Sequence, residues 1–479
     1  MVGMKSSLTA LAAALVLAGC SFAPKYERPT APVAEQFDHL SAADIEQDSA
    51  KLEALGWREF FTDAHLQGLI ELALLNNRDI RIAIDRIEEA RAQYGIAQSD
   101  QFPVLGVGGT GQVTRNPSDL RAGGPDAPSV SRFFQAGVGL TSFELDFFGR
   151  IRNLSDAAYN QYLATEQAQQ TVRINVVAQV AEAYFRWRSA QQMQDLMAST
   201  LASRERSYKL VNTLFEVGTA SALEQRQAQL QLDTIRADIQ KMKRAQMQAY
   251  NALTLLVGTT IPDDLPKPAV FGKNQIVADI PVGLPSSLLE RRPDILAAEF
   301  QLKAAYANVG AARAAFFPRV SITGLLGVAS PALSALFDSG RTYWQYAPQI
   351  TMPLFSGGVS GAFDLAKARQ NVAISNYEKS IQVAFKEVAD ALAGEATYAQ
   401  QLEALRAMES SAAESLRLAN LRYETGIDSF LQVQTAEINL YGAQQLFVQT
   451  GMESLLNRVL LYKALGGGWQ LDAQTQEQE

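Results

Sequence analysis

The chain has few side chains of the kinds that perform covalent or metal chemistry. Cys20 is the single cysteine among 479 residues, and His39 and His65 are the only histidines. No zinc-type spacing exists, and no serine–histidine–carboxylate set can be assembled around either histidine. The run Gly106–Gly111, GVGGTG, matches a dinucleotide-binding pattern, but the strand-like segment Gln112–Pro117 follows it where such a site needs a helix. We therefore expect no catalytic residues, no metal site and no nucleotide cofactor.

Cys20 lies at the end of an N-terminal signal. The apolar run Leu8–Ala18 follows Lys5, and its length fits a secretory signal peptide but is too short to span a bilayer. The run ends Leu-Ala-Gly-Cys20, which resembles the lipobox of bacterial lipoproteins. By that resemblance Cys20 receives a covalent lipid, the only cofactor we expect, and Ser21 favours the outer membrane. A buried free cysteine is the alternative interpretation.

Composition favours long helices and gives no basic surface for nucleic acid. The chain is rich in Ala, Gln, Leu, Arg and Glu, and its formal net charge is −8. No stretch after Cys20 holds 18 uncharged apolar residues, so we expect no transmembrane helix. Any crossing of a membrane would then use β-structure.

The sequence contains one unit twice. Matching residues are separated by 215 positions in the first part of the unit and by 208 in the second. The pairs are Asp79 and Asp294, Gly95 and Gly310, Phe102 and Phe317, then Gly218 and Gly426, Leu223 and Leu431, and Gly258 and Gly466. The drop of seven in the offset predicts a shorter loop in the second copy.

This duplication gives the predicted division of the chain. Each repeat is expected to hold a helix, a β-hairpin and two long helices. The boundaries are 1–19 for the signal peptide, 20–65 for a lipidated extended segment, 66–257 for the first repeat (hairpin about 103–145, long helices 150–257), 258–285 for a connector, 286–466 for the second repeat (hairpin about 319–353, long helices 361–465) and 467–479 for the tail.

The long helices and the hairpins have distinct patterns. Arg150–Val217 contains neither glycine nor proline, and as one helix it would extend about 100 Å. Apolar residues recur at alternating steps of three and four, as in coiled coils, with polar residues between them. The hairpin runs from Arg319 and from Tyr343 alternate apolar and polar residues over about ten positions, as membrane strands do, although soluble hairpins alternate in the same way.

Four strands per chain cannot close a barrel, and an open sheet edge is not viable in lipid. The residues therefore predict an oligomer, and they leave two or three copies equally open.

Several blocks resemble the signatures of outer membrane factors, the TolC-like outlet channels of tripartite efflux pumps, and especially their OprM/CusC-like lipoprotein branch. The blocks are ELDFFGRIRN (144–153), ERRPDILAAE (290–299), GAARAAFFPRVSITG (310–324), FKEVADALA (385–393) and LYKALGGGW (461–469). The resemblance implies a mixed α/β membrane protein whose duplicated half-units form a homotrimeric 12-strand outer-membrane β-barrel, continued by a periplasmic α-helical coiled-coil barrel. It implies a passive outlet for drugs or other toxic compounds, not an enzyme, with a periplasmic membrane-fusion adaptor and an inner-membrane RND transporter as partners.

The resemblance also locates a candidate aperture at the tip, where the long helices turn back at Gly218 and Gly426. A left-handed glycine suits such a reversal, while a simple kink is the alternative. Leu431 matches a leucine of the family aperture, although it could also be core. Thr435 stands where the family has an aspartate, and three threonines would not favour cations as three carboxylates do.

Other residues near the tip have possible roles. Glu437 or Asp428 could supply the missing carboxylate. Arg422 and Tyr423 match a pair that, in the family, latches the tip shut; the candidate acid partners of Arg422 are Asp195 and Glu224. A solvated arginine beside a packed tyrosine is the alternative.

Two further functions stay open. The outlet of a copper/silver efflux system would have nearly the same sequence, and a pore-free structural envelope lipoprotein would keep the coiled coil but leave the aromatic strands unexplained. An envelope enzyme needs a convergent polar site that the sequence lacks.

Overall fold

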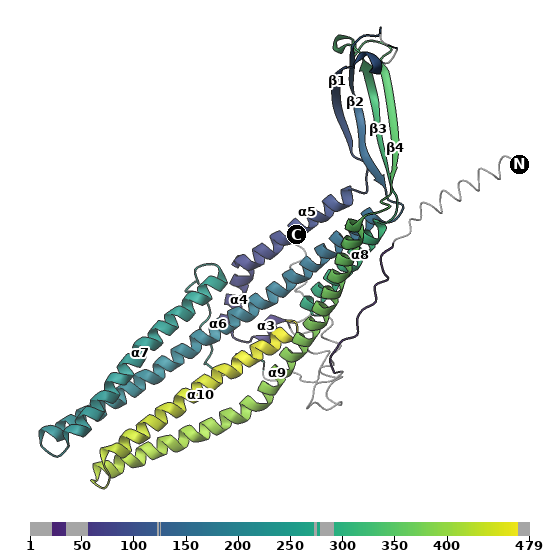
Figure 1. The fold of residues 1–479 in the computed structure, drawn as a ribbon. Helices are drawn as coiled ribbons and strands as arrows, with labels where there is room; N and C mark the ends of the chain where they lie inside the picture. The colour runs from purple at the N-terminus through teal and green to yellow at the C-terminus, as the bar shows by residue number, and fades with distance from the viewer. Residues whose placement is uncertain are drawn as a thin grey trace. The chain divides into compact units, whose positions relative to one another are not determined.

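The computed structural model describes residues 22–34, 56–121, 124, 126–272, 275–277 and 292–467. Cys20, His39, the signal peptide and the tail from residue 468 lie outside the described residues. The two repeats share one order of elements (Figure 1). The first holds α4 (Ala64–Asn76), α5 (Arg78–Ser99), β1 (Leu105–Arg115), β2 (Val130–Leu145), α6 (Arg150–Glu216) and α7 (Ala222–Val257), and the second holds α8 (Pro293–Ala314), β3 (Arg319–Ser330), β4 (Thr342–Thr351), α9 (Gly357–Glu424) and α10 (Phe430–Ala464).

The long helices form as their sequences predict. α6 has 67 residues and α9 has 68, and each is followed by a second helix of about half that length. The short helix α3 (Trp57–Phe60) precedes the first repeat, and the 3-10 turns η1 (Ser118–Leu120) and η3 (Leu333–Ala335) lie in the hairpin loops. Within the described part of the chain, none of the helices combines the length and the apolarity that crossing a membrane requires.

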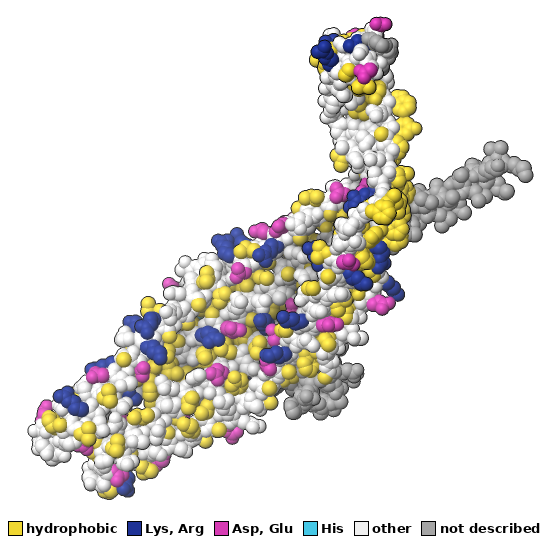
Figure 2. Space-filling model, in the orientation of Figure 1, with side chains coloured by type: hydrophobic (Ala, Val, Ile, Leu, Met, Phe, Trp, Pro, Cys, Tyr) yellow, Lys and Arg dark blue, Asp and Glu magenta, His cyan; other side chains and the backbone are white. Residues whose placement is uncertain are grey.

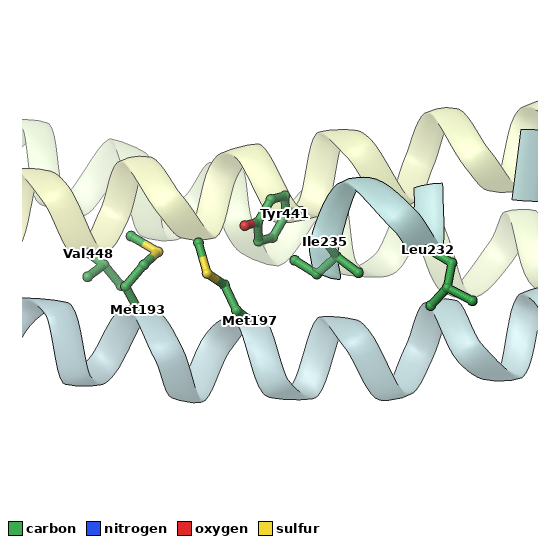
Figure 3. Packing of buried hydrophobic residues seen from close by; sticks show 6 residues of the cluster. All are labelled: Met193, Met197, Leu232, Ile235, Tyr441 and Val448. Carbon is green, nitrogen blue, oxygen red and sulfur yellow. The ribbon is translucent and has the colours of Figure 1, made fainter. Parts of the chain in front are cut away.

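Contacts divide the chain into two compact units, and each unit is built from both repeats. One contains residues 86–166 and 297–377 with all four strands, and the other contains most of the long helices. In the helical unit, apolar side chains from α6, α7 and α10 pack into a cluster, which is drawn in Figure 3. This cluster consists of Met193, Met197, Leu232, Ile235, Tyr441 and Val448.

The strands form one antiparallel sheet in the order β1-β2-β3-β4. The second hairpin is the shorter one, as the repeat offsets predict, but the loop accounts for only part of the loss. Its loop has three residues fewer than the first, and β4 has six fewer than β2. β2 also carries a bulge between Leu140 and Phe143, where Ser142 has a φ of 34°.

The register gives the sheet two chemically different faces. One row across the sheet is Val107, Val138, Leu326 and Trp344, and the row beside it, on the opposite face, is Gly108, Gly137, Gly327 and Tyr343. We call the first face the apolar face and the second the polar face. The apolar face also carries Leu105, Val113, Val130, Phe134, Leu140, Phe143, Leu145, Val320, Ile322, Val328, Tyr346 and Ile350, whereas the polar face carries Thr110, Gln112, Thr114, Gln135, Glu144, Ser321, Thr323, Gln345 and Gln349, with Phe133 and Leu325 as apolar exceptions.

The glycine row on the polar face brings β2 and β3 unusually close. A Cβ atom added to Gly327 would lie 2.0 Å from the backbone oxygen of Ala136, and one added to Gly137 would lie 2.4 Å from the oxygen of Leu326. Both contacts are with backbone, which cannot rotate away. Glycine is therefore required at this pair, and such positions let a sheet bend sharply.

Candidate functional site

The tip of each helix pair is a tight turn built on one left-handed glycine. Gly218 has a φ of 80° and Gly426 a φ of 75°, values at which only glycine is unstrained. In both turns the residues around the glycine donate backbone hydrogen bonds to carbonyls of the preceding helix, as at Gly218 to Phe215 and at Ile427 to Arg422. Both glycines thus reverse the chain between two helices, and neither is a kink within one.

Arg422 forms an ion pair across its own turn. Its Nε lies 2.5 Å from one carboxylate oxygen of Asp428, and its Nη2 lies 3.1 Å from the other. The hydrogen bonds from Arg422 hold the pKa of Asp428 below its ordinary value. Neither of the two predicted partners is the acid: Glu224 instead caps α7 through Ser221, and Asp195 lines a cavity of about 880 Å³ farther along α6.

Tyr423 packs into the tip. Its ring lies 5.5 Å from that of Phe430, beside the cluster of Val211, Ala228 and Val433. Burial raises the pKa of the Tyr423 hydroxyl, and the negative charge of Glu224 adds to the effect. Within one chain, therefore, Arg422 holds the turn through its ion pair with Asp428, and Tyr423 packs its ring against the apolar cluster of the tip.

Leu431 and Thr435 share one exposed stripe of α10. Leu431 is 52% exposed, so it is not a core residue of this chain. Thr435 is also exposed, and its hydroxyl donates to the backbone oxygen of Leu431 at 2.8 Å. Their spacing of four residues puts both on the same side of the helix. On the opposite side, Phe430 and Val433 are buried against the neighbouring helices.

Neither proposed substitute supplies a free carboxylate on this stripe. Glu437 turns toward α6, where the hydroxyl of Ser207 donates to it at 2.9 Å. Asp428 is paired with Arg422. The stripe that carries Leu431 and Thr435 is therefore uncharged at the position where the family has an aspartate.

Arg204, Tyr441 and Glu437 form a buried polar layer across the helical unit, beyond the apolar cluster at the tip. Sequence reasoning missed this layer. Arg204 of α6 is only 4% exposed; its Nη1 donates to the backbone oxygen of Gln231 at 2.8 Å, and its guanidinium lies 5.3 Å from the ring centre of Tyr441. Its Nε has no hydrogen-bond partner among the described residues. This layer lies between the apolar clusters of Met197 and of Val211. The only sequence signal is a charged residue in a seam of apolar ones.

Glu437 in this layer predicts a pH dependence of the stability of the folded protein. Burial raises the pKa of Glu437, against the smaller opposing effects of Ser207 and Arg204. The pKa of Glu437 is therefore higher in the folded chain than in the unfolded chain. The protonated carboxyl contributes its full stabilising free energy below pH 4.5, the ordinary value, and this contribution is lost as the pH rises through the raised pKa. We expect Glu437→Gln to unfold at a higher temperature than wild type at pH 7.5, with the difference shrinking as the pH is lowered toward 4.5. Parallel thermal melts followed by circular dichroism test this, and an unchanged difference at both pH values would contradict it.

These features place the chain in a known class: a duplicated unit of long paired helices, tight glycine tips and a two-faced open sheet. The family model described as outer membrane efflux protein matches residues 69–259 and 284–467. The chain belongs to the outer membrane efflux protein family, whose members are non-enzymatic transport components of the outer membrane.

The relatives match along almost the whole chain. The antibiotic efflux pump outer membrane protein ArpC of Pseudomonas putida is 42% identical over 97% of this chain and 96% of its own length. The toluene efflux pump outer membrane protein TtgC of the same species has the same identity and coverage. The crystal structure of the open MtrE outer membrane channel of Neisseria gonorrhoeae is 35% identical, with a TM-score of 0.80 over 94% of this chain and 99% of MtrE. The predicted fold class and the predicted role in efflux across the outer membrane are confirmed.

Proposed function

We propose that this chain forms a homotrimeric outlet channel. The observation that carries the proposal is the open four-stranded sheet: within the described residues, β1 and β4 each pair on one side only, and one face is apolar. Pairing of β1 with β4 of the next copy would satisfy both edges and put the apolar face toward lipid. Three copies give twelve strands, enough to enclose an aqueous lumen lined by the polar face.

The same assembly gives the tip its function. Three copies of the exposed α10 stripe, around one axis, would ring an aperture with Leu431 and Thr435. Such a ring closes by apolar contact rather than by charge. The outlet itself is passive. A periplasmic membrane-fusion adaptor docks at the tip, and an inner-membrane RND transporter supplies the transport energy.

Lipidation of Cys20 is part of the proposal. The ring of Phe22 stacks on Phe317 at 4.5 Å, and Arg313 donates to the backbone oxygen of Phe22 at 3.1 Å. Phe317 lies two residues before β3, at the end of the sheet where the helices begin. The chain is thus held, two residues after Cys20, where an acyl chain could enter the inner leaflet.

Organic toxic compounds are the cargo that we propose. ArpC and TtgC are named for antibiotic and toluene efflux. Deleting the gene should sensitise cells to several unrelated drugs and solvents, and wild-type chain should restore resistance. Sensitivity confined to copper or silver salts would instead assign the outlet to a metal system, and no sensitivity to any compound, in a strain without a second outlet, would favour a pore-free lipoprotein.

Thr435→Asp tests the proposed aperture. A ring of three carboxylates would concentrate negative potential and favour cations. We expect the permeability ratio of K⁺ to Cl⁻ in planar bilayers to rise several-fold, together with block by multivalent cations from the tip side. Thr435→Asn, of the same size and uncharged, is the control. Equal ion selectivity in both variants would exclude Thr435 from the aperture.

A further inference from the structure

Two arginines are the only charged residues on the apolar face of the sheet. The four strands hold four charged residues, namely Arg115, Arg132, Glu144 and Arg319. The register places Glu144 and Arg319 on the polar face, near the helices. Arg115 and Arg132 lie on the apolar face at the other end, beside the hairpin loop. In the view of Figure 2, both Lys/Arg and Asp/Glu side chains lie at that loop end of the sheet.

The two arginines are neighbours across the β1–β2 pair. Arg115 lies opposite Val130, and Arg132 lies opposite Val113, so the arginines are diagonal partners on one face. Diagonal partners are roughly 7–8 Å apart, and both side chains are exposed. Two like charges this close repel each other unless an anion lies between them.

Within the described part of the chain, no anionic side chain pairs with these two arginines. Among the hydrogen bonds and ion pairs of the described residues, none reaches the guanidinium of Arg115 or Arg132, and the loop acids Asp119 and Asp126 pair with neither. Other arginines of the same compact unit are engaged: Arg150, for example, binds Glu144 through two hydrogen bonds of 2.8 and 2.7 Å.

The position of Arg115 and Arg132 along the strands indicates which side of the membrane would supply their anion. On the apolar face of β2, only apolar or small residues lie between Phe134 and Leu145. Across the bulge this stretch matches ten steps of β3, or roughly 34 Å along the strand. Tilted as in membrane barrels it spans about 25 Å, which is the height of the apolar band of such barrels. The arginines therefore lie just beyond the hydrocarbon, on the side opposite the helices. Since the helices extend into the periplasm, that side is the outer leaflet.

We propose that Arg115 and Arg132 bind a phosphate group of an outer-leaflet lipid. Guanidinium forks bind phosphate oxygens with paired hydrogen bonds, and one phosphate between two such forks cancels their repulsion. Phe134, which lies next to Arg132 on the same face toward the hydrocarbon, suits the acyl chains of the same lipid. The inference rests on the membrane orientation in the proposed function, and it adds a lipid site that transport itself does not need.

The test uses purified full-length protein in detergent, with lipid binding measured by native mass spectrometry. The probes are diphosphorylated lipid A, its monophosphorylated form and phosphatidylethanolamine. We expect diphosphorylated lipid A to bind most tightly, and Arg115→Gln/Arg132→Gln to weaken it about tenfold or more. The matched control is Arg319→Gln, an exposed strand arginine of the polar face, which should bind lipid A as wild type does.

The outcomes separate the inference from the proposed channel. Equal lipid A binding by wild type and the double variant, or an equal loss in the Arg319→Gln control, would overturn the lipid site. Displacement of lipid A by millimolar inorganic phosphate would also overturn it, because the arginines would then select phosphate rather than lipid. Trimer mass and bilayer conductance are recorded on the same samples: normal values with no lipid effect refute only the inference, whereas a wild type without conductance refutes the proposed function.

Discussion

Gly327→Ala is expected to remove most of the folded protein from the outer membrane. The new Cβ would lie 2.0 Å from the backbone oxygen of Ala136 and 2.5 Å from Cα of Gly137. Neither atom belongs to a side chain that can rotate away, so β2 and β3 would have to separate by more than 1 Å at the centre of the sheet. We expect a cost of about 3 kcal/mol or more, because the β2–β3 pairing joins the two repeats.

Gly324→Ala is the matched control for this prediction. It lies in the same strand, but its Cβ would meet only ordinary contacts, at 3.6 Å from Gln345 and 3.8 Å from Leu140. The measurement is the amount of heat-modifiable protein in isolated outer membranes, compared on unheated and heated gels. Normal amounts of folded Gly327→Ala protein would show that the two strands are not held this close.

Asp63→Ala is the second large effect, and it acts in the helical unit. Asp63 is 1% exposed and accepts hydrogen bonds from four groups: the backbone of His65, the hydroxyl of Tyr184, the backbone of Ala269 and the amide of Gln275. Tyr184 and Gln275 are themselves buried, so alanine would leave two deeply buried donors without a partner. At about 1–3 kcal/mol for each orphaned group, we expect a loss of roughly 3–5 kcal/mol.

Asp63→Asn separates the hydrogen bonds from the size of the side chain. The amide oxygen still caps α4, and the amide nitrogen can donate to the Tyr184 hydroxyl. The same nitrogen faces the donors of Ala269 and Gln275, so we expect a smaller loss than in alanine without full rescue. Thermal unfolding of both variants at equal protein concentration, with circular dichroism, gives the comparison. Similar midpoints for wild type and Asp63→Ala would show that this buried carboxylate does not hold the connector to the helices.

Periodicity and duplication predicted the architecture well because both are local or repeated signals. The glycine-free stretch after Arg150 became a single helix, and the alternation from Arg319 became a strand with one apolar face. The tip turns at Gly218 and Gly426 could be predicted because a reversal between two helices needs a residue in the left-handed conformation. Both copies of the unit have a glycine at this position.

Pairings between distant segments could not be read in this way. Asp63 meets residues that follow it by 121 to 212 positions, and no pattern near Asp63 indicates them. Arg204 and Glu437 approach each other only because α6 and α10 pack together. The error over Arg422 is different: its partner, Asp428, is six residues away, but only the geometry of the turn brings the two together.

The exposed stripe of α10 is the part of the proposed channel that a single measurement can test most directly. Cys20 is the only cysteine in the sequence, and the proposed lipidation would block its thiol, so Thr435→Cys would add a unique free thiol. Conductance in planar bilayers is measured before and after a bulky thiol reagent, with wild type and Glu437→Cys, which turns toward α6, as controls. We predict that the reagent blocks most of the Thr435→Cys current and leaves both controls unchanged. Full current through Thr435→Cys channels that mass spectrometry finds fully labelled would contradict an aperture lined by this stripe.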